Sequence, residues 1–169
     1  MRGQWMSAVA VLSAGCGSAG TIGNAPVHAC SSPLLGTWKL QSYTTAYEDG
    51  QTVESFGAHP GGYLSYSADC RMYGIVVSEG RRRPANVVPS DAEKAALFAS
   101  MGAYAGTYTI AGDEVTHHVD VSWIESWTGT AQVRRFRIEG NTLHIRSAPA
   151  VDPADGRVSS ATLIWTRVQ

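Results

Sequence analysis

The sequence predicts an all-β fold, an antiparallel up-and-down β-barrel of about eight to ten strands with one short helix between the fourth and fifth strands. From Leu34 onward, apolar residues recur mostly at every second position, which is the spacing of one face of a β-strand. Turn residues separate these alternating runs at short intervals. No regular helical crossover joins successive runs, which argues against a parallel α/β sheet.

The alternating runs give the expected strands in order along the chain. Tight turns are expected at Ala68-Asp69, at Gly112-Asp113 and at Gly140-Asn141, because these residue types favour short hairpin connections. The expected strands cover residues 36–47, 51–56, 62–67, 71–78, 104–110, 114–123, 130–138, 142–147 and 161–168.

One helix interrupts this series of strands. Ser90 is followed three residues later by Glu93, which is the spacing of a capping box, and good helix formers continue to about Gly102. Short and long connections alternate along the chain. In an up-and-down barrel, tight turns therefore close one end while loops and the helix surround the other, and we expect the mouth at the loop-rich end.

The first residues differ in composition from the rest. An apolar run follows Arg2 and ends at Cys16; it is too short to cross a bilayer but suits a secretory signal. The segment LSAGC resembles a bacterial lipoprotein cleavage box, so lipidation of Cys16 and a membrane tether are expected. Cleavage near Cys30, and an uncleaved cytosolic tail, stay open as alternatives. We therefore divide the chain into a signal or lipoprotein-type segment (1–16), a flexible linker (17–33) and a barrel (34–169), and expect an exported protein, either an envelope lipoprotein or secreted.

The overall composition argues against a disordered chain and against a nucleic-acid partner. Apolar residues make up 44% and charged residues 16%, which argues against disorder, and a formal net charge of −1 gives no electrostatic footprint for nucleic acid. The basic run 81–83 is interpreted as a solvated loop, with an anion contact as the alternative.

If Cys16 is lipidated, Cys30 and Cys70 remain as an even pair that can form a disulfide. No metal or other cofactor is expected.

The alternation in 114–123 separates two adjacent histidines, because neighbouring strand residues point to opposite faces. His117 shares its parity with apolar residues and is expected inside, whereas His118 is expected outside. The same rule gives an inward set on the other strands: Trp38, Leu40, Ser42, Arg71, Tyr73, Tyr108, Val121, Trp123, Gln132, Arg134, Phe136 and Trp165. Two alternatives stay open: His117 can be an internally satisfied core residue, and Arg134 can lie on the outer face.

Several segments resemble a known family. Gly36-Thr37-Trp38 is similar to the start of the lipocalin barrel, and Arg167 matches the arginine that stacks on that tryptophan. With LLGTWKLQSY, YAGTYTI, VTHHVDVSWIESWTGTAQVRRF and LIWTRV, the chain resembles the short bacterial and fungal lipocalin-like domain proteins from Leu34 to Val168. The resemblance implies a barrel with an interior cavity and directs attention to Tyr66, Tyr104, His117, Trp127, Gln132 and Arg134.

The chain departs from that family at two places. Cys70 stands where the family usually has glycine. The helix interrupts the middle of the barrel, whereas lipocalins carry theirs after the last strands, and this arrangement places Trp38 near the loop-rich end.

Three functions are compatible with these observations. The first is an exported barrel that binds a small apolar, aromatic or acidic molecule in its interior. Its expected ligand-binding residues are Trp38, Tyr66, Tyr73, Tyr104, Trp123, Trp127, Gln132, Phe136 and Trp165. The second is a cofactor-free isomerase, cyclase or hydratase acting on a hydrophobic carbonyl compound, with His117 as general acid or base and with Arg134 and Tyr108 stabilising an enolate oxygen. The third is an envelope lipoprotein that binds no ligand.

Overall fold

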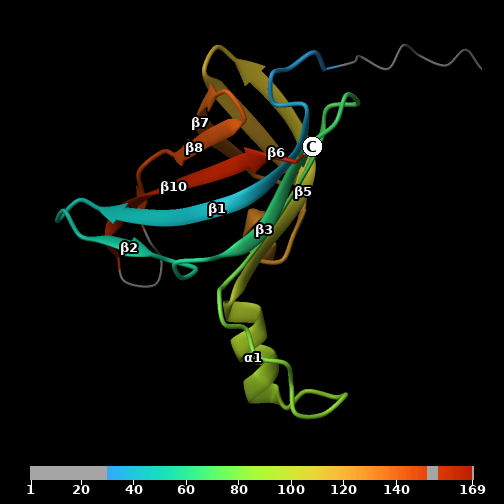
Figure 1. Ribbon diagram of the computed structural model, residues 1–169, viewed down its shortest axis with the longest axis vertical. Coiled ribbons are helices and arrows are strands. Elements are labelled where there is room, and N and C mark those ends of the chain that lie inside the picture. The colour runs from blue at the N-terminus through green and yellow to red at the C-terminus, as the bar shows by residue number, and fades with distance from the viewer. Residues whose placement is uncertain (1–29, 152–155, 169) are drawn as a thin grey trace, which may run out of the picture.

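The computed structural model describes residues 30–151 and 156–168, and they form a closed antiparallel β-barrel (Figure 1). Each wall strand pairs with the next, and β1 pairs with β10 to close the ring of eight strands. The predicted all-β architecture is therefore confirmed. The wall strands are β1 (Gly36–Tyr47), β3 (Gly61–Tyr66), β4 (Arg71–Val77), β5 (Met101–Ala111), β6 (Glu114–Ser122), β7 (Ala131–Glu139), β8 (Thr142–Ser147) and β10 (Val158–Arg167).

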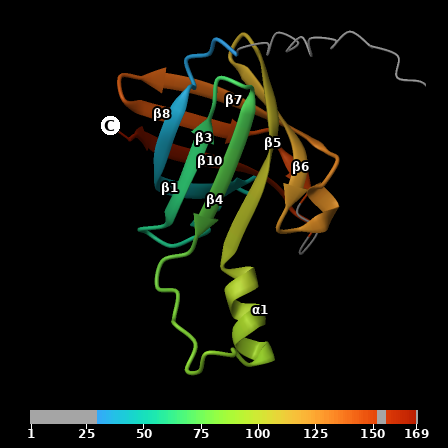
Figure 2. The same cartoon turned by 90° about the vertical axis from the view of Figure 1, so that its right-hand side faces the viewer.

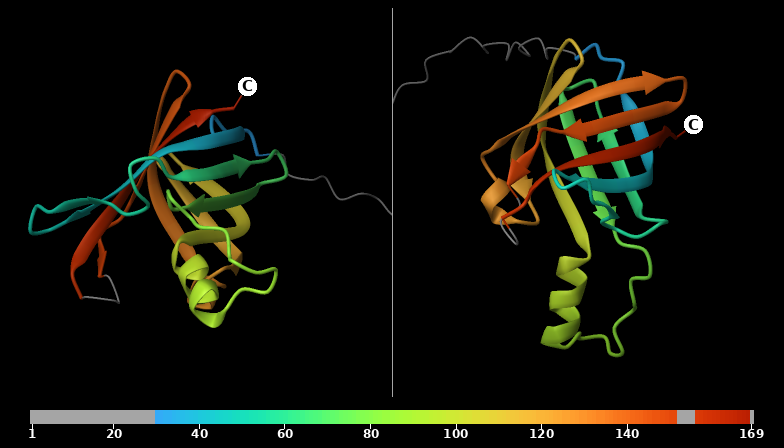
Figure 3. Two further views of the ribbon diagram at one scale, coloured as in Figure 1. Left: turned by 60° about the horizontal axis from the view of Figure 1, so that its bottom comes forward. Right: turned by 90° about the vertical axis from the view of Figure 1, so that its left-hand side faces the viewer.

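Two short strands extend the sheet without forming part of the closed wall. Strand β2 (Thr52–Glu54) pairs only with the end of β1, and β9 (Ala150–Val151) pairs with β10. Figure 3 shows the β1–β2 hairpin reaching outward from the barrel. The segment 51–56, expected as a wall strand, is therefore a short side ladder, and β1 pairs directly with β3.

The helix lies where the sequence predicts it, between β4 and β5. Ser90 caps α1 (Asp91–Ala99), with the reciprocal contacts of Ser90 and Glu93 that define a capping box. The helix ends before Gly102 because β5 already begins at Met101. No residue of α1 is buried, and both Figure 1 and Figure 2 show the helix projecting away from the strands.

The end of the barrel opposite α1 is filled by Trp38. Its side chain is fully buried, its indole Nε1 donates to the carbonyl of Leu34 at 2.8 Å, and the guanidinium of Arg167 lies 4.0 Å from the ring centroid. The expectation that Trp38 lies near the loop-rich end is wrong. Strand β2 is not part of the wall, so the whole segment that joins the end of β1 at Tyr47 to the start of β3 at Gly61 lies at the open end. The first residues of β1, including Trp38, therefore lie at the closed end.

A disulfide between Cys30 and Cys70 joins the start of the described chain to the β3–β4 turn. The backbone N–H of Cys30 also donates to the carbonyl of Ala68 at 2.8 Å. Residues 30–33, expected as part of the flexible linker, are thus held against the closed end. Cys70 has a φ of 65°, a conformation that favours glycine, the residue that the family resemblance implies at this position. The predicted signal segment and Cys16 lie outside the described residues.

An irregularity in β1 changes which of its residues face inward. The pairing of β1 with β10 shifts register between Leu40 and Ser42. An extra residue in one strand reverses the alternation beyond it. The expected inward position of Ser42 is therefore wrong, and Tyr43, Thr45 and Tyr47 point into the barrel instead.

A second irregularity occurs in β6. Gly106 and Ala105 of β5 pair with Val119 and Val121, so that Asp120 is the extra residue. Val121 is 59% exposed, and its expected inward orientation is wrong for the same reason as that of Ser42.

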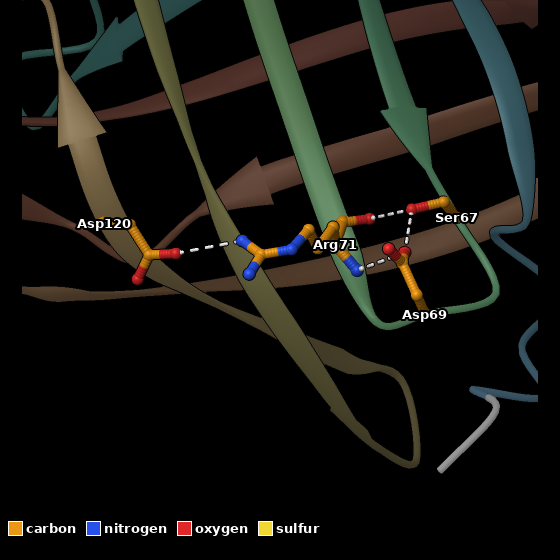
Figure 4. Close-up of polar contacts among 4 residues, drawn as sticks. All are labelled: Ser67, Asp69, Arg71 and Asp120. Atoms are coloured by element: carbon orange, nitrogen blue, oxygen red, sulfur yellow. Dashed lines mark hydrogen bonds and ion pairs between the residues drawn. The ribbon is translucent and has the colours of Figure 1, made fainter. Parts of the chain in front are cut away.

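Strand β4 presents the opposite face from the one expected. Met72 pairs with the buried Tyr66 and is itself buried, whereas Tyr73 is 53% exposed. Figure 4 shows Arg71 on the outside, where its guanidinium lies 3.4 Å from the carboxylate of Asp120. The expected inward positions of Arg71 and Tyr73 are therefore wrong. The interior face of β4 consists of Met72, Gly74 and Val76. Because Gly74 has no side chain, this face does not show the apolar alternation that marks an inward row in the sequence.

Candidate functional site

The barrel encloses a cavity of about 710 Å³ at its open end. Wall strands, the β2 hairpin and the loops after β6 and β8 contribute its lining, which agrees with the predicted mouth. The lining is mainly aromatic and aliphatic, with few polar side chains. It includes Tyr43, Thr45, Tyr47, Val53, Phe56, Leu64, Val76, Tyr104, His117, Trp123, Trp127, Gln132, Arg134, Ile145, Val151, Ala161, Leu163 and Trp165.

His117 lies at the inner part of this cavity between two tyrosines. Its side chain is 1% exposed. The hydroxyl of Tyr66 lies 2.7 Å from Nε2, and the hydroxyl of Tyr104 lies 2.7 Å from Nδ1. His118 lies on the exposed outer face and contacts Thr109. The predicted orientations of both histidines are therefore confirmed.

The surroundings of these three side chains keep them neutral. Burial, with a smaller contribution from the positive charge of Arg134, lowers the pKa of His117 to about 3. Burial raises the pKa of Tyr104 to about 12 and that of Tyr66 well above its usual value. At neutral pH the group therefore consists of an uncharged imidazole and two protonated phenols.

Arg134 lies beside this group, on the inner face of β7. Its guanidinium donates to Oε1 of Gln132 at 3.1 Å and to the carbonyl of Val133 at 2.9 Å. Gln132 in turn donates to Oγ1 of Thr130 at 2.9 Å. Among the residues that the structure describes, no carboxylate forms an ion pair with Arg134. The cavity therefore contains a positive charge held by neutral partners, and the alternative that Arg134 lies on the outer face is wrong.

Aromatic rings surround the outer part of the cavity. Trp127 contacts Tyr104 and Trp123 edge-on, with centroid distances of 5.6 Å in both pairs. Trp123 also reaches α1, where its indole N–H donates to the carbonyl of Phe98 at 3.3 Å. These rings provide flat apolar surface next to the polar group around His117, which is the composition of a small-molecule pocket.

Five of the expected site residues do not line the cavity. Tyr66 is buried and contacts His117, but it is not among the lining residues. Tyr108 is buried at the closed end, where its hydroxyl donates to the carbonyl of Ser67 at 3.3 Å, so it cannot contact a molecule in the cavity. Trp38 fills the closed end and does not line the cavity. Tyr73 points to solvent. Phe136 packs against the buried core below the cavity lining.

The sequence pattern did not predict the inward residues in the second half of β1, or the ring of Phe56 that packs against one of them. Tyr43, Thr45 and Tyr47 line the cavity because of the irregularity after Leu40, and Phe56 contacts Tyr43 with a centroid distance of 4.8 Å. No local sequence signal marks that irregularity. The aromatic content of 36–47 is the available signal, since two tyrosines occupy the row that regular alternation predicts to face solvent.

Within residues 30–151 and 156–168, no group of three or more histidine, cysteine or carboxylate side chains is placed to hold a metal ion. No helix in the same part of the chain is long and apolar enough to cross a membrane.

Comparison with known proteins identifies a family. The model of the lipocalin-like domain family matches residues 35–168. No curated protein matches the chain. The solved structures include a lipocalin-like protein from Bacteroides uniformis, with 14% identity, a TM-score of 0.42, and coverage of 80% of this chain and 98% of that one. An uncharacterized protein from Bacteroides eggerthii has 11% identity, a TM-score of 0.40, and coverage of 80% and 99%. Since the family match spans nearly all of the barrel, the chain belongs to the lipocalin-like domain family.

Proposed function

We propose that the barrel binds a small molecule with an apolar, preferably aromatic, body and one acidic or carbonyl oxygen. The observation that carries this proposal is Arg134, a guanidinium without an ion-pair partner among the described residues, inside an aromatic-lined cavity of about 710 Å³. Arg134 is half-buried and its guanidinium donates only to neutral acceptors, so an anionic or strongly polarised oxygen on the ligand would add a charge-assisted hydrogen bond and complete the site.

The experiment is a binding screen with a cavity-filling variant. Native mass spectrometry and tryptophan fluorescence would be recorded with long-chain and aromatic carboxylic acids, since Trp123 and Trp127 line the cavity. In Gly74→Leu the new side chain projects into the lumen, and an added Cβ there meets its nearest neighbours at ordinary contact distances of 3.6 to 4.0 Å. The matched control is Tyr73→Leu, on the outer face of the same strand.

We expect binding to the wild type and to Tyr73→Leu, and a loss of at least tenfold in Gly74→Leu. Equal affinity in all three proteins would place the bound molecule outside the barrel and contradict the proposal.

A second candidate is a cofactor-free isomerase, cyclase or hydratase. Tyr104 and Arg134 both line the cavity and favour this candidate, because both can donate hydrogen bonds to a developing enolate oxygen. The expected role of Tyr108 as an enolate-stabilising donor belongs to Tyr104 instead, because Tyr108 does not line the cavity. Both ring nitrogens of His117 are occupied by tyrosine hydroxyls, so a general acid or base role requires one of them to move. Unchanged turnover of a substrate in His117→Ala would end this candidate.

We also propose export, as an envelope lipoprotein or a secreted protein. The Cys30–Cys70 disulfide supports an oxidising compartment, where such bonds persist. Mass spectrometry of the protein from its native host, with and without a Cys16→Ser substitution, tests both cleavage and lipidation. An intact N-terminus on a cytosolic protein would contradict this proposal.

A further inference from the structure

The two tyrosines that contact His117 lie in different surroundings. Tyr66 is 1% exposed, does not line the cavity, and among the described residues its hydroxyl has only Nε2 of His117 as a partner. Tyr104 lines the cavity, so its hydroxyl proton can reach water or a bound molecule. This asymmetry determines in which direction the hydrogen bonds run.

A neutral imidazole carries one N–H, and the other nitrogen accepts. If Nε2 carried the proton, it would donate to the oxygen of Tyr66. The hydroxyl proton of Tyr66 would then remain in the apolar core without an acceptor, which is unfavourable for a buried donor. If Nδ1 carries the proton, Tyr66 donates to Nε2 and Nδ1 donates to the oxygen of Tyr104, so that the buried protons of Tyr66 and His117 both have an acceptor.

The second arrangement has a consequence for the cavity. Because Tyr104 accepts from Nδ1, its own O–H is directed away from His117 and is available inside the lumen. Arg134, which also lines the cavity, supplies further N–H donors. Trp165, another lining residue, has a buried indole N–H without a partner, and no buried side-chain acceptor of the described residues is left unpaired. The unpaired buried polar group at the cavity is therefore a donor, as are the N–H groups of Arg134 and the O–H of Tyr104.

We propose that Tyr66, acting through His117, fixes Tyr104 as a hydrogen-bond donor to the cavity, so that the site selects ligands bearing an acceptor oxygen, such as a ketone, an enolate or a carboxylate. Tyr66 and His117 are positioning residues here, and Tyr104 is the group that touches the ligand. This inference rests on the proposed function, because it names the chemistry that the same cavity recognises.

The first test needs no ligand. Long-range proton–nitrogen correlation NMR of the protein labelled with ¹⁵N-histidine distinguishes the two neutral tautomers, since the protonated and bare ring nitrogens resonate far apart. We expect His117 as the Nδ1–H tautomer at pH 7. In Tyr66→Phe the bias toward that tautomer is lost, whereas the outer-face control Tyr73→Phe keeps it. Protonation of Nε2 in the wild type would overturn the proposal.

The second test uses two probes of nearly the same shape, 4-acetylbiphenyl and 4-ethylbiphenyl. The ketone adds one neutral acceptor, which separates hydrogen bonding from the charge of Arg134. We expect the wild type to bind the ketone about tenfold more tightly by competition calorimetry. Tyr104→Phe removes this preference, and Tyr66→Phe reduces it although Tyr66 does not reach the lumen. Tyr73→Phe leaves it unchanged.

The outcomes separate this inference from the proposed function. Equal affinity for the two probes, or a preference that survives in Tyr104→Phe, overturns the inference while leaving a binding barrel intact. If neither probe nor any acid in the screen binds, the proposed function fails together with the ligand selection, even where NMR shows the Nδ1–H tautomer.

Discussion

Acidification should destabilise this protein specifically through His117. In the folded state the pKa of this imidazole is lowered from 6.5 to about 3, chiefly by burial, whereas in the unfolded chain it returns to its ordinary value. Between these values the unfolded state binds one more proton than the folded state. The free energy of unfolding therefore falls as pH drops below 6.5, with a slope approaching about 1.4 kcal/mol per pH unit, and flattens near the folded pKa.

From pH 6 to pH 4 this linkage removes about 2 kcal/mol of stability. The assay is urea unfolding, followed by fluorescence, at half-unit pH steps for the wild type and for His117→Gln. Carboxylates titrate in both proteins, so the difference between the two curves isolates the imidazole. His118→Gln is the matched control, because it leaves the buried ring in place and should keep the wild-type pH dependence.

Parallel curves for the wild type and His117→Gln, within about 0.5 kcal/mol over this range, would refute the reasoning, because they would mean that the imidazole protonates in the folded protein as easily as in the unfolded chain. Direct NMR titration of His117 in the wild type checks the same point without a substitution.

Three further predictions concern stability, each measured by urea denaturation. Replacing Cys30 and Cys70 with serine should cost up to about 4 kcal/mol, from the loop entropy of a 40-residue separation, and no difference from the oxidised wild type would contradict this. Leu143→Ala, in the fully buried core, should cost about 2 to 5 kcal/mol, whereas Phe98→Ala on the projecting helix should cost less than about 1 kcal/mol; the reverse order would be inconsistent with the position of α1. Trp38→Phe keeps a ring in the floor but leaves the Leu34 carbonyl without its donor, and should cost about 1 to 3 kcal/mol, so a neutral result would argue against that bond.

Strand alternation predicted the site where the strands are regular. The inward orientations of His117 and Arg134, and the outward one of His118, follow from the two-residue period of β6 and β7 alone. The same rule failed beyond the irregularity of β1, and at Val121 beyond that of β6, because one extra residue exchanges the two faces. It also failed in β4, where glycine occupies an inward position and the exposed Tyr73 resembled a core residue.

The composition of the polar group could not be predicted from the pattern of one strand. Tyr66 and His117 are separated by 51 residues, and their contact depends on the register of β3, β4 and β5 between them. Tyr108 has the same inward parity as Tyr104 on β5, but it lies further toward the closed end. Parity gives the face of a strand and not the depth along the barrel, so the alternation alone predicts a cavity position for Tyr108, although Tyr104 lines the cavity and Tyr108 does not.

The central claim, a hollow interior in which Tyr104 and Arg134 receive the oxygen of a guest, is tested most directly by locating a bound molecule. The measurement is a crystal structure of the protein grown with 4′-bromobiphenyl-4-carboxylate, with the bromine located by its anomalous signal. We predict a bromine peak inside the barrel near Trp123 and Trp127, with the carboxylate at Tyr104 and Arg134. A lumen filled by collapsed side chains, with bromine found only on the outer surface, would contradict the account.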